Sequence, residues 1–202
     1  MRLQNITVFD FETSGLDPAR DRVIEMAAIR CYEGEIVSQF TTLVRFDGRL
    51  APKITELTGL TDAQLALGMD EDTAFRILNR VIGDSTLVAH NAMFDLSFLH
   101  HALQRLAGRS FSNDFLDTLT ISRMRHPYPH TLNDMCARYG IANQHAHRAL
   151  SDVYACWELL GKMNEEASVE PALNLLGYLP KYGMPKWRPD QARMEKIEMK
   201  YA

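Results

Sequence analysis

Cysteine is scarce in this sequence. The three cysteines, Cys31, Cys136 and Cys156, lie far apart and form no C-x-x-C pair. An odd, scattered set argues against a disulfide framework and against a cysteine-based zinc site. We therefore expect reduced thiols in the core of a cytoplasmic protein.

Long apolar runs are absent as well. No run approaches the roughly 20 residues that a membrane-spanning helix needs, so we expect no membrane contact. A hydrophobic strand begins by Val8, which leaves no room for a cleavable signal peptide, and we expect none. The sequence also contains no internal repeat and no low-complexity stretch.

A large net charge is the third absence. The formal charge is −4 over 202 residues, of which 46% are apolar and 24% charged, as in ordinary globular proteins. After Pro180 there are six basic and three acidic residues, so the tail carries about +3 and the rest of the chain about −7. An acidic body argues against nucleic-acid binding by charge alone, although bound metal ions would reverse the local sign.

The order of apolar patterns predicts an α/β fold. A hairpin meander comes first and strands then alternate with helices, which indicates a mixed sheet with helices on both faces. We expect strands over 6–11, 23–32, 36–46, 86–89 and 115–116, and helices over 52–57, 70–82, 92–106 and 148–164. Two more short helices should start at caps formed by Asp117 and Thr131, the second stopping at Gly140.

The last strong helix and the segment after it differ in character. On residues 148–164 we expect a packing face at helical spacing, formed by Leu150, Val153, Tyr154, Trp157 and Leu160. Beyond about residue 166, four prolines break any long helix. We therefore divide the chain into a domain over 1–165 and a proline-containing basic extension over 166–202, which lies on the domain or reaches a partner.

Two acidic residues interrupt the first hydrophobic strand. Asp10 and Glu12 lie in the stretch V-F-D-F-E-T-S-G-L-D, flanked by Val8, Phe9 and Phe11. Residues i and i+2 of a strand point to the same face, so the two carboxylates lie side by side. Burying such a pair is costly without a compensating cation. The pair therefore predicts a site for a hard divalent cation.

Three further residues extend this pair into a candidate catalytic set. Asp95 starts the helix after the strand at 86–89, Asp152 lies early in the last helix, and His147 precedes Asp152 by five residues. Each acid alone could be an ordinary first-turn residue favoured by the helix dipole. His145 competes with His147, and Glu25 on the second strand is interpreted as structural.

Four carboxylates and a histidine suit two-metal phosphodiester chemistry. Paired Mg²⁺ or Mn²⁺ ions can hold both the attacking and the leaving oxygen when a phosphodiester bond is hydrolysed. A histidine near its ordinary pKa can accept the proton from the attacking water. All-oxygen ligands favour Mg²⁺ or Mn²⁺ over zinc. We expect two Mg²⁺ ions, with Mn²⁺ able to substitute.

Three motifs of this chain contain the candidate residues: D-F-E-T-S-G-L-D, H-N-A-M-F-D and H-R-A-L-S-D. In order and spacing they resemble the three motifs of the DnaQ-like DEDDh 3′→5′ exonucleases. This family includes proofreading epsilon subunits, RNase T and oligoribonuclease. The resemblance covers roughly residues 4–165. It implies an RNase H-like fold with a five-stranded mixed sheet. It also implies Asp10, Glu12, Asp95 and Asp152 as metal ligands and His147 as general base.

The resemblance further implies contacts with the terminal nucleotide. These would come from Thr13 through its backbone, and from Leu16, Leu57, Thr58, Asn91, Phe94 and Leu99. The implied activity is release of nucleoside monophosphates from single-stranded 3′ ends. Proofreading of DNA, with a polymerase subunit as a partner, is the first choice; RNA trimming and a non-catalytic, polymerase-associated binding module are the alternatives.

Overall fold

The first strand, β1, lies at the centre of the main sheet. The computed structural model describes residues 4–143 and 148–201. The sheet order is β3-β2-β1-β4-β5. Strand β2 pairs antiparallel with both β1 and β3, whereas β4 pairs in parallel with β1 and with β5. The strands are β1 (Asn5–Thr13), β2 (Val23–Tyr32), β3 (Glu35–Leu43), β4 (Thr86–Ala89) and β5 (Phe115–Asp117). This five-stranded mixed sheet confirms the predicted fold class.

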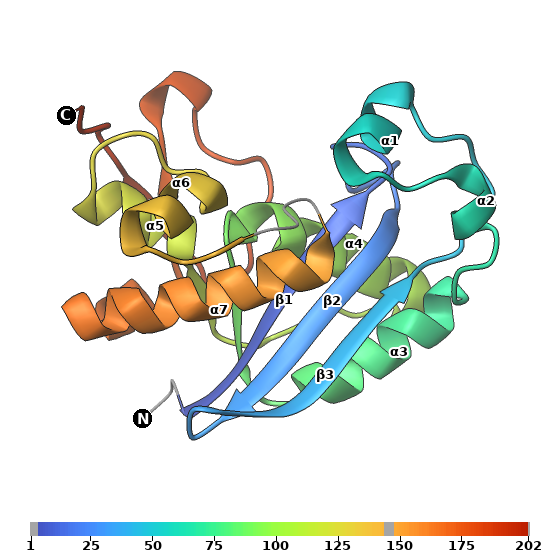
Figure 1. Cartoon of the computed structure of the whole chain (residues 1–202), viewed down its shortest axis with the longest axis horizontal. Helices are drawn as coiled ribbons and strands as arrows, with labels where there is room; N and C mark the ends of the chain where they lie inside the picture. The colour runs from blue at the N-terminus through green and yellow to red at the C-terminus, as the bar shows by residue number, and fades with distance from the viewer. Residues whose placement is uncertain (1–3, 144–147, 202) are drawn as a thin grey trace.

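Seven α-helices surround the sheet in the described part of the chain. They are α1 (Pro52–Thr58), α2 (Asp62–Leu65), α3 (Glu71–Ile82), α4 (Ala92–Ala107), α5 (Thr118–Arg125), α6 (Leu132–Tyr139) and α7 (Ala149–Glu166). In Figure 1, α7 crosses one face of the sheet and α3 and α4 lie behind the other. None of the described helices has the length and apolar character that crossing a membrane requires.

The alternation of side chains along β1 divides the core between the two faces. Ile6 and Val8 pack into the cluster that contains the buried residues of α7, whereas Phe9 and Phe11 pack against α3 and α4. Because the period of a strand is two, Asp10 and Glu12 continue the face that α7 covers. The carboxylates therefore point toward the helix that carries Asp152.

Local capping confirms several predicted helix starts. Thr131 and Asp134 form a capping box on α6, which ends at Gly140 in a left-handed conformation. Asp117 caps α5 by accepting from the backbone of Leu119 and Thr120. These signals were readable from the sequence because each involves residues only a few positions apart.

Two elements within residues 4–165 differ from the prediction. The third strand ends at Leu43 rather than at residue 46, and the short helix α2 was not predicted. On α7 the predicted packing face is confirmed: Val153 and Leu160 are buried, and the half-buried Leu150, Tyr154 and Trp157 pack against the same core cluster. Ala149, Ala155, Cys156, Leu159 and Met163 complete the buried face. The small residues among them suit close packing of α7 on the sheet.

The segment after residue 165 is folded onto the domain. Strand β6 (Leu175–Tyr178) pairs in parallel with β7 (Arg193–Lys196). Asn174 exchanges hydrogen bonds with the backbone of Phe115 in β5, and the backbone N–H of Gly177 donates to the Thr120 hydroxyl at 2.9 Å. A Cβ atom at Gly177 would lie 2.0 Å from the end of the Ile197 side chain, so any larger residue there would require Ile197 to move. Both short strands were missed in the sequence.

Candidate active site

Three carboxylates meet where β1 ends and α7 begins. Oxygens of Asp10, Glu12 and Asp152 all lie within 4.8 Å of one another. Asp152 is supplied by α7, which lies far from β1 along the chain. Figure 1 shows this helix beginning beside the end of β1. Three converging carboxylate oxygens form a donor set that suits a hard divalent cation.

Asp95 reaches this site from the other side of β1. Strand β4 pairs with β1 only at Ile6–Val8, so the later part of β1 has no strand partner on that side. The first turn of α4 fills the space, and a carboxylate oxygen of Asp95 accepts the backbone N–H of Phe11 at 3.0 Å. Asp95 lies outside the set of three oxygens described above, but its charge is the strongest electrostatic influence on Asp10.

Burial and the charges of neighbouring carboxylates raise the pKa values of Asp10, Glu12 and Asp95. Burial is the largest cause for Asp10, followed by the charges of Asp95, Glu12 and Asp152. Burial likewise raises the pKa of Asp95. The pKa of Glu12 is raised from 4.5 to about 7 by burial and by the charges of Asp152 and Glu25. The cluster is therefore strained when every member is ionised, and a bound divalent cation would relieve that strain.

A predicted consequence is that divalent metal changes the pH dependence of stability. A carboxylate whose pKa is raised on folding favours the folded state at low pH, and this contribution is lost as the pH rises through the folded pKa. For Glu12 the window runs from 4.5 to about 7. The corresponding free energy is roughly 3 kcal/mol, or roughly 5–10 °C in Tm. We therefore compare the Tm of the wild type with that of Glu12→Gln in chelator. The wild-type Tm minus the variant Tm should fall between pH 5 and pH 8.

Mg²⁺ or Mn²⁺ should reverse most of that fall at pH 8. The measurement is thermal unfolding at each pH in chelator and in metal, for the wild type and for Glu12→Gln. The difference between the two proteins isolates Glu12 from the other groups that titrate. A wild-type Tm that tracks Glu12→Gln at every pH, with or without metal, would contradict the prediction.

An ion pair anchors the start of α7 next to the cluster. Glu25 lies opposite Glu12 in the β1–β2 register. Its carboxylate accepts from the Arg148 guanidinium at 2.9–3.2 Å and from the backbone N–H of Ala149 at 3.4 Å. Arg148 is the residue that precedes α7. This pair fixes the helix that carries Asp152, which gives Glu25 the structural role expected of it and adds Arg148 to the site.

Two other supporting residues were missed in the sequence. Asn143 donates to a carboxylate oxygen of Asp152 at 2.7 Å and accepts from Ser151 at 2.8 Å, which orients the Asp152 carboxylate. Asp117 caps α4 as well as α5, because it accepts the backbone N–H groups of Asn91 and Ala92 at 3.0 Å. Both contacts join residues that local patterns do not connect.

The predicted nucleotide contacts fall into two groups. Leu16, Leu57 and Asn91 are exposed and Phe94 is half-buried, so these side chains can reach a ligand. Thr13 and Thr58 are buried and donate to neighbouring backbone carbonyls, of Gly15 at 2.6 Å and of Ile54 at 2.9 Å.

Leu99 is 1% exposed and packs in the core under α4, away from the surface that a nucleotide contact requires. His147 and its competitor His145 lie outside the described residues.

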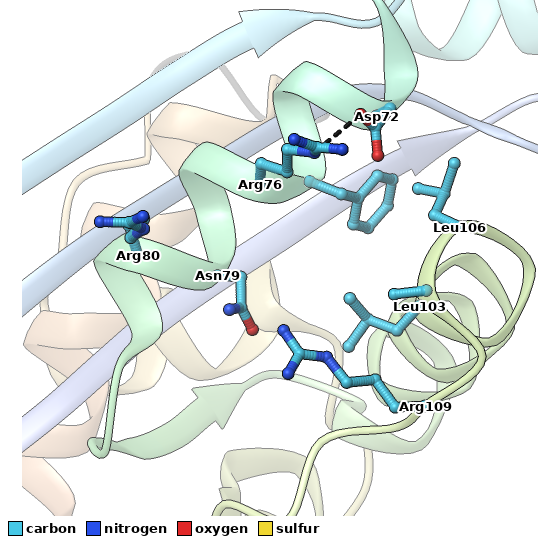
Figure 2. Close-up of a pocket in the computed structure, with 9 residues that line it drawn as sticks. Asp72, Arg76, Asn79, Arg80, Leu103, Leu106 and Arg109 are labelled. Atoms are coloured by element: carbon cyan, nitrogen blue, oxygen red, sulfur yellow. Dashed lines mark ion pairs between the residues drawn. The ribbon is translucent and has the colours of Figure 1, made fainter.

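A second pocket, of about 370 Å³, lies between α3 and α4. Figure 2 shows Arg76, Arg80 and Arg109 around an apolar floor that includes Leu103 and Leu106, and Arg76 pairs with Asp72. Leu106 lies roughly 16 Å along α4 from Asp95, at 1.5 Å per residue. The pocket therefore lies well away from the acidic cluster.

Comparisons with known proteins agree with this site. Residues 7–160 match the exonuclease family model RNase_T. DNA polymerase III PolC-type of Bacillus cereus is 38% identical over 162 residues, which cover 79% of this chain and 11% of that protein. The protein of that name from Bacillus subtilis is 38% identical over 168 residues, which cover 82% of this chain and 12% of that protein. The chain thus spans only about an eighth to a ninth of the length of these relatives.

Solved structures show the same fold. A structure of Exonuclease I superposes with a TM-score of 0.72 at 21% identity, covering 83% of this chain and 42% of that one. Escherichia coli Exonuclease I in complex with a dT13 oligonucleotide gives 0.71 at 21% identity, covering 80% and 41%. With the acidic motifs in place and the family model matched over most of its length, the chain belongs to the DnaQ-like family of 3′→5′ exonucleases.

Proposed function

We propose that this protein removes nucleoside monophosphates from the 3′ ends of single-stranded DNA with the help of two divalent cations. The observation that carries this proposal is the convergence of Asp10, Glu12 and Asp152 within 4.8 Å, with the charge of Asp95 acting on the same cluster. A structural role for such a cluster is unfavourable, because like charges repel and are partly desolvated.

The donor set fits Mg²⁺ or Mn²⁺. Every group that converges is a carboxylate, and hard cations prefer oxygen ligands. Asp10, Glu12 and Asp152 would hold one ion, and Asp95 would join Asp10 in holding a second. Bound ions supply Lewis-acid activation of water and stabilisation of charge on the phosphate and the leaving oxygen. The chain itself supplies the orientation, through Asn143 on Asp152 and the Glu25–Arg148 pair under α7.

His147 is proposed as the general base. In the sequence it precedes Ala149, the first residue of α7, by two positions and Asp152 by five. A histidine with a pKa near 6.5 is partly neutral at pH 7 and can accept a proton from the attacking water. His145 is the alternative base.

The terminal nucleotide is proposed to lie between the loop after β1 and α1. Leu16, four residues after Glu12, is 82% exposed, and Leu57, on α1, is 48% exposed. In Figure 1, α1 lies near the end of β1. Exposed apolar side chains next to a catalytic site suit a base or a sugar. Asn91 and Phe94, at the start of α4, would contact the same nucleotide, and Thr13 would do so through its backbone.

DNA is favoured over RNA by the relatives. The similar proteins from two Bacillus species are named as DNA polymerases, and the related Exonuclease I was solved with a DNA oligonucleotide. A proofreading role beside a polymerase subunit is therefore our first choice. RNA trimming and a non-catalytic binding module remain the alternatives.

The test is a comparison of matched DNA and RNA oligonucleotides, single-stranded and with a mismatched 3′ end. We expect stepwise shortening from the 3′ end in Mg²⁺ or Mn²⁺, faster on DNA and on the mismatched end than on a paired end. Chelator should stop it. Faster degradation of the RNA would assign the protein to RNA trimming. No degradation of any substrate between pH 7 and pH 9 would support the binding module.

A further inference from the structure

The C-terminal extension forms one wall of a cleft that reaches the start of α4, the helix that carries Asp95. The cleft has a volume of about 440 Å³ and lies between the start of α4, the region of α5 and α6, and the extension. The last residues of the chain hold the extension against this region: Lys200 donates to the Met124 carbonyl at 2.7 Å, and its own carbonyl accepts the Tyr128 N–H at 2.8 Å. The extension is thus a built part of this surface.

The lining of the cleft combines cations with aromatic rings. Arg123 and Lys181 supply two positive charges, and Tyr128 and Tyr182 are 55% and 74% exposed. The ammonium group of Lys181 lies 4.6 Å from the ring centre of Tyr182. No acidic residue is among the described residues that line the cleft. In a chain with a net charge of −4, a site free of carboxylates is suited to an anionic ligand.

Arg123 is the least satisfied of these groups. Within residues 4–143 and 148–201, no hydrogen bond or ion pair holds its guanidinium. Burial lowers its pKa from the ordinary value, because the half-buried charge is incompletely solvated. A phosphate group would supply the bidentate partner that the guanidinium lacks.

The cleft approaches the proposed catalytic site at the start of α4. Asn91 lines it and directly precedes α4, one turn before Asp95. The ring of His90 accepts or donates at Thr118 at 2.9 Å on one side and donates to the His130 carbonyl at 2.9 Å on the other. These bonds tie the wall of the cleft to the start of α4. In Figure 1, α1 lies on one side of the end of β1, and α5, α6 and the extension lie on the other.

We propose that this cleft binds the DNA strand on the 5′ side of the scissile bond, with Arg123 and Lys181 on phosphates and Tyr182 and Tyr128 stacked on bases. The inference rests on the proposed function, because it uses the same strand whose 3′ nucleotide lies near Leu16 and Leu57. A basic groove with interleaved aromatic rings is the usual device for holding a single strand without sequence preference.

The test compares a long and a minimal substrate in the full-length protein. The long substrate is a single-stranded 20-nucleotide DNA, and the minimal one is the p-nitrophenyl ester of thymidine 5′-monophosphate, which occupies only the terminal position. We expect Tyr182→Ala to raise KM for the long DNA about tenfold, the effect of one lost stacking contact. KM for the ester should not change. Tyr182→Phe should retain the wild-type KM, because its ring still stacks.

Lys181→Ala should raise KM for the long DNA and lower the slope of log KM against log salt by about 0.7, as expected for one lost phosphate contact on a single strand. Lys186→Ala is the matched control: it is an exposed lysine of the same extension that does not line the cleft. The four variants change three exposed side chains, Tyr182, Lys181 and Lys186, and thermal unfolding checks the fold.

The outcomes separate the two proposals. If the wild type cleaves neither substrate, the proposed function fails. If it cleaves both and Tyr182→Ala and Lys181→Ala leave the long-DNA KM unchanged, the cleft is not part of the substrate path. An equal effect of Lys186→Ala would mean that the overall charge of the extension acts, and this too would overturn the cleft assignment.

Discussion

Asp10→Asn should abolish turnover while leaving the protein folded. Besides burial, the charges of Asp95, Glu12 and Asp152 all raise the pKa of Asp10. Removing its charge removes a ligand that both proposed ions share. Charge stabilisation by bound metal is worth several kcal/mol, so we expect a loss of at least roughly 10³-fold in kcat.

The same substitution should stabilise the metal-free protein. The raised pKa of Asp10 shows that its ionised form is disfavoured in the folded state. An uncharged amide of the same shape removes that cost, so Tm in chelator at pH 8 should rise or stay level. Loss of activity together with unchanged or higher stability excludes unfolding as its cause. Asp72→Asn, on α3 and outside the cluster, is the matched control and should retain full activity.

The metal assignment would be refuted by two results. One is retention of most activity by Asp10→Asn. The other is a Tm that responds to Mn²⁺ as strongly in Asp10→Asn as in the wild type, since a shared ligand cannot be removed without weakening metal binding.

His147→Ala should cut kcat by roughly 10²–10⁴-fold, the usual range for a lost general base. Metal binding should persist, because the carboxylates that hold the ions are untouched. The two effects are measured separately, kcat on single-stranded DNA and the rise of Tm on addition of Mn²⁺. His145→Ala, two residues away, is the control and should retain at least half of the activity.

Three outcomes would contradict this role for His147. If the variant no longer responds to Mn²⁺, His147 is a ligand. If His145→Ala is the slower enzyme, the general base is His145. If kcat at high pH recovers fully without the imidazole, hydroxide replaces the base at little cost and its contribution is smaller than proposed.

Short-range patterns predicted much of this molecule. The two-residue period of a strand was enough to place Asp10 and Glu12 on one face, and the structure turns that face toward α7. The caps at Thr131 and Asp117 were predicted because a side chain and the backbone groups it satisfies lie within three residues of each other. Motif order and spacing were enough for the family, which the family model confirms.

Contacts between distant segments were decided only by the tertiary structure. Glu25 and Arg148 are 123 residues apart, and no local pattern indicates that they pair. The same is true of Asp117 at the start of α4. The resemblance implied a nucleotide contact for Leu99, and the packing of α4 on the sheet buries this side chain in the core.

The acidic pair in β1 and the motif residues around it were determined by the sequence alone, because strand and helix periods govern which face a side chain occupies. The tertiary structure decided what surrounds them: the carboxylate of Asp95 beside an unpaired edge of β1, the ion pair that holds α7, and the extension folded back to form a cleft. Each of these depends on segments that meet only when the whole chain has packed.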